Sequence, residues 1–171
     1  ADVIIDLATL TGAAQSAGGS YHACVLTNSD ALECAAISAG KKSGELVHPL
    51  PYCPELHARD LKSTVADLRN ACLGKMQAPP SSLAGLFIGS HIEGCLEDPP
   101  RGAGPEGAPE GGPKGPPLWL HVDMASTVTE ERATGYGPAL LLALLMPQHP
   151  LLGGEVPPGG PKGPPSERTP L

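Results

Sequence analysis

The sequence has few aromatic residues, no long hydrophobic run and no cluster of positive charge. Aromatic residues make up 3% of the 171 residues, so any core must be built mainly from Leu, Val, Ile and Ala. The longest apolar stretch, Pro138 to Pro147, is too short to cross a bilayer, which takes about 20 residues. The formal net charge is -7, whereas a nucleic-acid-binding surface needs clustered Lys and Arg. We therefore expect neither a membrane nor a nucleic-acid partner.

Disulfide and export signals are missing as well. The five cysteines form no CxxC pair and are odd in number. This is typical of reduced, partly buried thiols in a cytoplasmic protein, and not of a disulfide framework or a zinc knuckle. No basic region followed by an apolar segment opens the chain, so the sequence does not predict a signal peptide. Ala1 stands directly before a strand-like run, and we interpret this start as that of an incomplete chain.

Two segments are instead rich in Pro and Gly. Residues 97–117 hold 7 Pro and 6 Gly, and residues 147–171 hold 8 Pro and 5 Gly. Such compositions bury too little apolar surface to offset their ordering entropy, so we expect disorder in both. Both contain the heptapeptide GGPKGPP, which fits a repeat-prone linker. A polyproline ligand and mistranslated non-coding sequence are the alternatives.

Strand and helix signals alternate in the rest of the chain. Strand-like runs lie at residues 2–6, 21–27 and 118–124. Helical patterns follow a cap at Asn28 or Ser29 up to Gly40 or Gly44, begin at Pro54, and cover residues 83–92 and 137–146, whereas residues 13–19 are a stretch of small residues. Alternating strands and helices predict an α/β domain with a mostly parallel sheet.

The most informative string is DLATLTGA, residues 6–13, which places a small-residue loop after a strand. Loops at the carboxyl edge of an open α/β sheet are where ligands bind. Gly12 allows close approach of another backbone, and Thr9 and Thr11 supply hydroxyl and main-chain groups. The loop is therefore a candidate binding segment.

DLATLTGA also resembles the sequence that follows the metal-binding motif of M17 leucyl (cytosol) aminopeptidases. The resemblance continues in order through SGELVHPLP, STVADL, the small-residue helix near residues 82–92, LWLHVDMA and ATGYGPALLLALL. It covers nearly everything outside the two Pro/Gly segments. The strings YHACVLTNS, VHPLPYCPEL and PSSLAGLFIGSHI are most similar to a vertebrate branch of aminopeptidase-like proteins within that family.

The resemblance implies a fold and an activity. Residues 1–146 would form a partial three-layer α/β catalytic domain, with a mostly parallel central sheet flanked by helices. The Pro/Gly segment 97–117 would interrupt this domain, and 147–171 would be a disordered tail. The family removes N-terminal amino acids from peptides, so a peptide is the implied substrate. A cytoplasmic location and a homo-oligomer, a hexamer in the family, are implied too.

The resemblance also assigns substrate contacts. In the family the loop after this strand holds the substrate backbone, and that role falls on Thr9, Leu10 and Gly12. Two residues after the HVDM strand flank the pocket for the N-terminal side chain, and they correspond to Ala125 and Val128. A small wall residue beside an apolar one suits an aliphatic or aromatic side chain.

The catalytic apparatus of the family has no counterpart here. It consists of two divalent metal ions, Mn²⁺ or Zn²⁺, held by a Lys and several carboxylates, a second Lys, and an Arg, all N-terminal to DLATLTGA. We therefore expect no metal ligand and no catalytic residue in this chain, and no activity from it alone. The alternative is a non-catalytic truncated or splice product that acts as an oligomerisation or binding module. Either way, the sheet should expose an edge and an apolar face.

Three other patterns have a chemical and a structural interpretation. His121 and Asp123 share a strand face, which suits two metal ligands or a hydrogen-bonded structural pair. Cys24 lies two residues after His22, which suits a thiol nucleophile or two ordinary side chains. Residues 134–137 (TGYG) precede a helix, where an anion binds or the chain merely enters the helix. The structural interpretation is favoured in each case.

Overall fold

The computed structural model describes residues 1–71, 75, 77–96, 116–128 and 133–147. The disorder expected for 97–117 and 147–171 lies almost wholly outside these residues, and the domain boundaries stay predictions. Within the described part, no helix is long and apolar enough to span a membrane.

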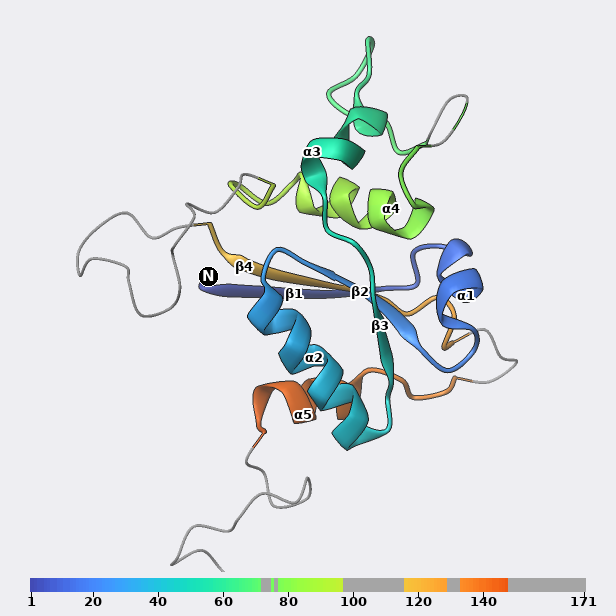
Figure 1. The fold of residues 1–171 in the computed structure, drawn as a ribbon, viewed down its shortest axis with the longest axis vertical. Coiled ribbons are helices and arrows are strands. Elements are labelled where there is room, and N and C mark those ends of the chain that lie inside the picture. The colour runs from blue at the N-terminus through green and yellow to red at the C-terminus, as the bar shows by residue number, and fades with distance from the viewer. Residues whose placement is uncertain (72–74, 76, 97–115, 129–132, 148–171) are drawn as a thin grey trace, which may run out of the picture.

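Four strands form one mixed sheet in the order β1-β4-β2-β3 (Figure 1). They are β1 (Val3–Ala8), β2 (Ala23–Thr27), β3 (Val47–Pro49) and β4 (Leu118–Asp123). β1 runs parallel to β4 and β2 parallel to β3, whereas β2 and β4 are antiparallel. The predicted α/β fold with a mostly parallel sheet is therefore confirmed, with one antiparallel junction at its centre.

Helices cover both faces of this sheet and make three layers (Figure 1). α4 (Pro80–Gly89) lies on one face, with α3 (Pro54–His57) and a 3₁₀ turn (Ala58–Leu61) beyond it. α2 (Asp30–Ser43) and α5 (Pro138–Leu145) lie on the other face. The short α1 (Ala13–Gly18) follows β1 at the carboxyl end of that strand.

Strand alternation divides the core into two halves. On one side Leu26 and Trp119 pack with Leu86 of α4, and on the other side Val25 and Val122 pack with the helices α2 and α5. The helix α4 approaches the sheet closely because Gly85 has no side chain: a Cβ there would lie 2.7 Å from Leu26 Cδ2. The two-sided burial explains why both faces of these strands carry apolar side chains.

The helix α2 shows how local sequence sets an element's ends. The Ser29 hydroxyl accepts a hydrogen bond from the Leu32 amide at 3.3 Å and caps the first turn. At the other end Gly44 adopts φ 80°, a left-handed conformation that favours glycine. Of the two predicted helix ends, Gly40 and Gly44, the structure confirms Gly44.

Other elements differ from the prediction in type or extent. Residues 13–18 form a helix where only a small-residue stretch was expected, and Thr11 Oγ1 accepts a bond from Ala14 N at 3.2 Å at its start. Residues 47–49, for which no strand was predicted, form the short strand β3 at the edge of the sheet, where a proline is tolerated. α4 begins at Pro80, three residues earlier than predicted, because proline suits the first helical turn.

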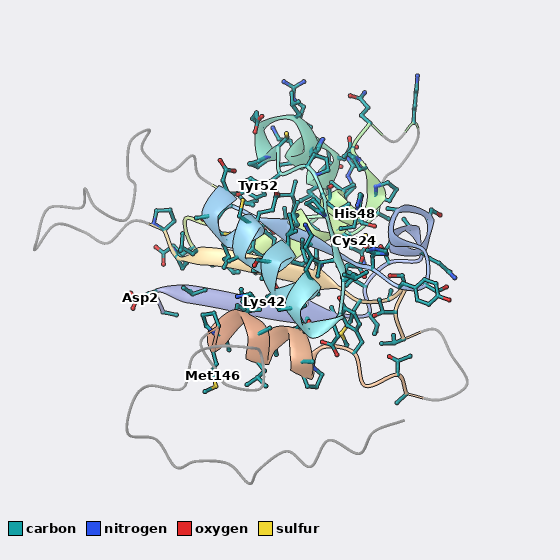
Figure 2. The ribbon with its side chains drawn as sticks, turned by 60° about the horizontal axis from the view of Figure 1, so that its bottom comes forward. Asp2, Cys24, Lys42, His48, Tyr52 and Met146 are labelled. Carbon is teal, nitrogen blue, oxygen red and sulfur yellow. The ribbon has the colours of Figure 1, made fainter. Side chains whose placement is uncertain are left out.

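The expected exposed edge is present at β1. Among the described residues β1 pairs with β4 alone, and none of its six residues is buried. Val3 and its register partner Leu118 are 45% and 43% exposed. Leu145 and Met146, at the end of α5, are also exposed, and Figure 2 shows Asp2 and Met146 at the same end of the molecule. An apolar face thus borders the open edge.

The two segments that flank residues 97–115 lie side by side. A Cβ on Gly94 would be 3.2 Å from Pro116 Cβ. Asn28 Nδ2 donates to Pro117 O at 3.0 Å, and Asn28 Oδ1 accepts from Trp119 N at 2.8 Å. Asn28 thereby fixes the entry into β4.

We expect the domain to keep its fold when residues 97–115 are replaced by a Gly-Ser linker about a quarter as long. Its ends already meet, and closing a shorter loop costs less entropy, so the free energy of unfolding should rise by about 1 kcal/mol. Urea denaturation measures this, and a Gly-Ser replacement of unchanged length is the control. A loss of several kcal/mol in both variants would show that this segment belongs to the core.

Candidate functional site

The parallel pairing of β1 and β4 brings two connecting segments to one edge of the sheet. Residues 9–12, the 9–12 loop, follow β1, and residues 124–128, the 124–128 turn, follow β4. Ala8 is the register partner of Asp123, and Met124 N donates to Ala8 O at 2.8 Å. The structure thus brings together the segments that carry all five residues assigned to substrate binding.

The side chain of Asp123 joins these two segments. It is fully buried at the end of β4. Its Oδ1 accepts bonds from the amides of Leu10 (3.1 Å), Thr11 (3.3 Å) and Ala125 (3.2 Å). Its Oδ2 accepts a bond from Thr11 Oγ1 at 2.6 Å. One carboxylate therefore holds the 9–12 loop and the start of the 124–128 turn in a single arrangement.

This arrangement decides which main-chain groups of the loop stay open. The amides of Leu10 and Thr11 are engaged by Asp123. The Leu10 carbonyl and the Gly12 amide have no hydrogen-bond partner among the described residues. Leu10 is 38% exposed, and Thr9 and Gly12 are exposed as well. The Leu10 carbonyl and the Gly12 amide, two residues apart, are therefore among the main-chain groups that the loop leaves open.

Gly12 has no steric role in the fold itself. Its φ is -65° and its ψ is -21°, a conformation open to every residue. A Cβ at this position would meet no atom of the described residues within 4 Å. The space above Gly12 is therefore open to another molecule.

Ala125 and Val128 lie in the turn on the other side of Asp123. Both are half-buried, and the Thr127 amide closes the turn onto Met124 O at 3.1 Å. The side chain of Ala125 is a single methyl group. The role of both residues in substrate binding stays a prediction.

A cavity of about 350 Å³ opens beside the 9–12 loop. Thr11 forms one side of it, and the other lining residues come from α4 and the segment before it: Leu61, Asn70, Ala71, Pro80, Leu83, Ala84 and Phe87. Most of these side chains are apolar. The cavity gives the site a mainly apolar recess next to its polar loop.

The sequence interpretation did not foresee that Asp123 and Thr11 hold the site together. Asp123 was considered as one half of a pair with His121, either as metal ligands or as a hydrogen-bonded structural pair, and Thr11 as a source of hydroxyl and main-chain groups. A signal was present, because an Asp that ends an otherwise apolar strand must find hydrogen-bond donors when it is buried. Thr11 could have been identified as one such donor, in a loop at the same sheet edge.

His121 takes part in a separate network on the same strand face. Its Nδ1 lies 2.5 Å from Asp6 Oδ1, and Trp119 Nε1 donates to Asp6 Oδ2 at 2.7 Å. His121 Nε2 is buried and has no partner among the described residues. His121 and Asp123 therefore do not act as one pair: each is tied to a different part of the chain, which favours the structural interpretation.

The carboxylates near the loop do not fit a metal. Both oxygens of Asp123 and both oxygens of Asp6 are already engaged by neighbouring donors. Within the described part of the chain, no group of three or more His, Cys, Asp or Glu residues could hold a metal ion. The donor set needed for the two implied metal ions is thus not found among these residues.

Cys24 does not have the features of a nucleophile. Its Sγ donates to Ala14 O at 3.7 Å, while His22 Nδ1 contacts Gly18 O at 3.2 Å, so the two side chains do not pair. Burial, together with the nearby charge of Asp123, raises the pKa of the Cys24 thiol to about 11. The thiol therefore stays protonated near neutral pH, and the thiolate is the reactive form.

The turn before α5 is occupied by the protein's own carboxylate. Glu45 Oε2 accepts bonds from Gly137 N at 3.0 Å and Leu140 N at 2.6 Å. An acidic group at a helix N-terminus is favourable, and here it takes the place that a bound anion would need. The structure supports the helix-entry interpretation of residues 134–137.

Known proteins are similar to this chain in sequence and in fold. The family model described as cytosol aminopeptidase family, catalytic domain, matches residues 1–142. The mouse (Mus musculus) protein named probable aminopeptidase NPEPL1 is 49% identical over 145 residues, which cover 84% of this chain and 24% of that protein. Leucine aminopeptidase 1 of Caenorhabditis elegans is 46% identical over 146 residues, which cover 85% and 26%.

Solved structures give the same result. The leucine aminopeptidase of C. elegans matches with a TM-score of 0.73 and 42% identity, over 89% of this chain and 28% of that chain. The leucyl aminopeptidase of Leishmania major, solved in complex with actinonin, matches with a TM-score of 0.67 and 36% identity, over 84% and 23%. The chain thus spans about a quarter of the length of the curated relatives that it matches.

We expect Asp123→Asn to destabilise the fold by about 1–3 kcal/mol, because charge-assisted hydrogen bonds become neutral ones and an amide N–H₂ faces the Thr11 hydroxyl. Urea denaturation followed by circular dichroism measures the change. Asp67→Asn, at an exposed position, is the control and should stay within about 0.5 kcal/mol of the wild type. Equal stabilities for both variants would contradict the anchoring role of Asp123.

Proposed function

Because the chain belongs to the M17 cytosol aminopeptidase family, we propose that it forms the peptide-binding side of a metal-dependent aminopeptidase catalytic domain. The activity of the whole protein would be the removal of N-terminal amino acids from peptides. The single observation that carries the proposal is the Asp123 carboxylate, which joins the 9–12 loop to the 124–128 turn. The two segments with assigned substrate contacts thereby become one surface.

The open groups of the 9–12 loop suit an extended peptide. A substrate main chain offers an N–H donor and a C=O acceptor in alternation. The Leu10 carbonyl accepts the substrate N–H, and the Gly12 amide donates to a substrate carbonyl. Thr9 borders this contact, and the missing side chain of Gly12 lets the substrate backbone approach.

The 124–128 turn supplies the side-chain contact. Ala125 and Val128 flank the N-terminal side chain of the peptide, and their apolar character favours an aliphatic or aromatic residue there. The mainly apolar cavity beside Thr11 is suited to a further substrate side chain. These residues bind and orient the substrate, and none of them is assigned a proton-transfer or nucleophilic step.

The two divalent metal ions, Mn²⁺ or Zn²⁺, belong to a part of the family's catalytic domain that these residues do not supply. The carboxylates next to the loop are already engaged, so no step through a metal is derived for this chain. A cytoplasmic location is part of the proposal, and bacterial relatives named probable cytosol aminopeptidase support it.

Binding of a peptide such as Leu-Gly-Gly tests the proposal. Titration into the ¹⁵N-labelled chain should shift the amide signals of Gly12, Ala125 and Val128. Gly12→Ala should weaken binding on the order of tenfold. It should leave the free energy of unfolding unchanged or raise it by about 0.4–1 kcal/mol, since its Cβ meets no atom of the fold. Shifts confined to other residues, or unaltered binding by the variant, would contradict the assigned contacts.

An activity assay separates binding from catalysis. The isolated chain should not hydrolyse Leu-p-nitroanilide above the blank rate with added Mn²⁺ or Zn²⁺. Turnover that is abolished by a chelator would show that the chain itself carries a metal site and would overturn this division of roles.

A non-catalytic oligomerisation or binding module is the second candidate, and the open edge of β1 favours it. An unpaired strand edge beside exposed apolar side chains is a surface to which other chains bind. Light scattering coupled to size-exclusion chromatography checks the homo-oligomer, a hexamer in the family, that the resemblance implies. We expect a mass above that of one chain; a strictly monomeric chain that binds no peptide would contradict both candidates.

A further inference from the structure

The hydroxyl group of Ser81 reaches the candidate site through one other side chain. Ser81 lies in the first turn of α4 and is 4% exposed. Its Oγ is 2.8 Å from Thr11 Oγ1, and Thr11 Oγ1 is 2.6 Å from Asp123 Oδ2. A continuous chain of hydrogen bonds therefore joins α4 to the carboxylate that holds the 9–12 loop.

The donor and the acceptor of each hydrogen bond between Ser81, Thr11 and Asp123 follow from counting the available protons. The Asp123 carboxylate takes part in all four of its bonds as an acceptor, as an ionised carboxylate does. The single hydroxyl proton of Thr11 is therefore used on Asp123. Thr11 Oγ1 can then only accept, and it does so from Ala14 N at 3.2 Å and from the hydroxyl of Ser81.

Ser81 thus has a defined effect on Thr11. Hydrogen bonds in a chain polarise one another, so the donation from Ser81 strengthens the bond that Thr11 makes to Asp123. It also fixes the rotamer of Thr11, because the hydroxyl oxygen must face both the helix and the carboxylate. The backbone of residues 10 and 11 is held by the same carboxylate, so the orientation of the loop depends on this contact.

We propose that Ser81 is a positioning residue for the peptide-binding surface. Through Thr11 and Asp123, Ser81 holds the 9–12 loop and Ala125 in one arrangement. Its effect on the order of the loop is independent of what the loop binds. Its effect on peptide affinity rests on the proposed function, and the experiment measures the two effects separately.

The neighbouring residue provides a matched control. Ser82 lies in the same turn of α4 and is fully buried, and its hydroxyl has no hydrogen-bond partner among the described residues. Ser81→Ala and Ser82→Ala remove the same atom from adjacent buried positions of one helix. Only the first of them removes a bond to the loop.

Amide hydrogen exchange tests the effect on loop order. Ser81→Ala should speed the exchange of the Leu10, Thr11 and Ala125 amides on the order of five- to tenfold, with β2 amides unchanged, whereas Ser82→Ala should leave all of these rates as in the wild type. Thr11→Ser, which keeps the hydroxyl, should retain slow exchange, and Thr11→Val should lose it. Equal loop rates in Ser81→Ala and Ser82→Ala would overturn the proposal.

Titration with Leu-Gly-Gly tests the effect on the site. If the wild type binds, Ser81→Ala should weaken binding several-fold at a melting temperature close to that of Ser82→Ala, and unchanged affinity would overturn the role of Ser81 in binding. If the wild type binds no peptide, the proposed function fails, and the exchange rates alone then support or overturn the positioning of the loop by Ser81.

Discussion

The buried carboxylate of Asp123 is the constraint on which the site depends. An ionised carboxylate that leaves water loses several kcal/mol of hydration unless donors replace it. Asp123 is fully buried, and the four donors come from both connecting segments. The fold therefore cannot bury the end of β4 without closing the 9–12 loop onto it. Folding of the sheet and shaping of the site are one event.

The same carboxylate also limits which main-chain groups of the 9–12 loop a ligand could reach. A loop of this length offers several main-chain groups, and an extended peptide could bind in more than one register. Asp123 removes the amides of residues 10 and 11 from this set, and the Leu10 carbonyl and Gly12 amide are left open. In the proposed function, an extended peptide backbone would pair with these two groups, and Asp123 would shape its binding surface without touching it.

Much of the fold followed from local sequence, and the site followed only in part. Ser29 and Gly44 carry their cap chemistry in their own side chains and backbones, so both ends of α2 were among the positions that the sequence predicted. The helix α1 was missed because its start depends on Thr11. The Thr11 hydroxyl is held in place by its hydrogen bond to Asp123, 112 residues away. Contacts over such separations leave no periodic pattern. The donation from Ser81 to Thr11 is likewise visible only when α4 and the loop are in place.

The open edge of β1 and the engaged carboxylates both bear on what this chain can do by itself. β1 has the apolar sequence of a strand that is covered on both faces, yet none of its residues is buried in this chain. Asp6, on that strand, is turned toward Trp119 and His121 and serves the packing of β4. The charged groups of this chain thus stabilise its own sheet and loops. If the chain is the peptide-binding side of an aminopeptidase, as proposed, groups that adjoin the uncovered side of β1 would lie next to the peptide-binding surface.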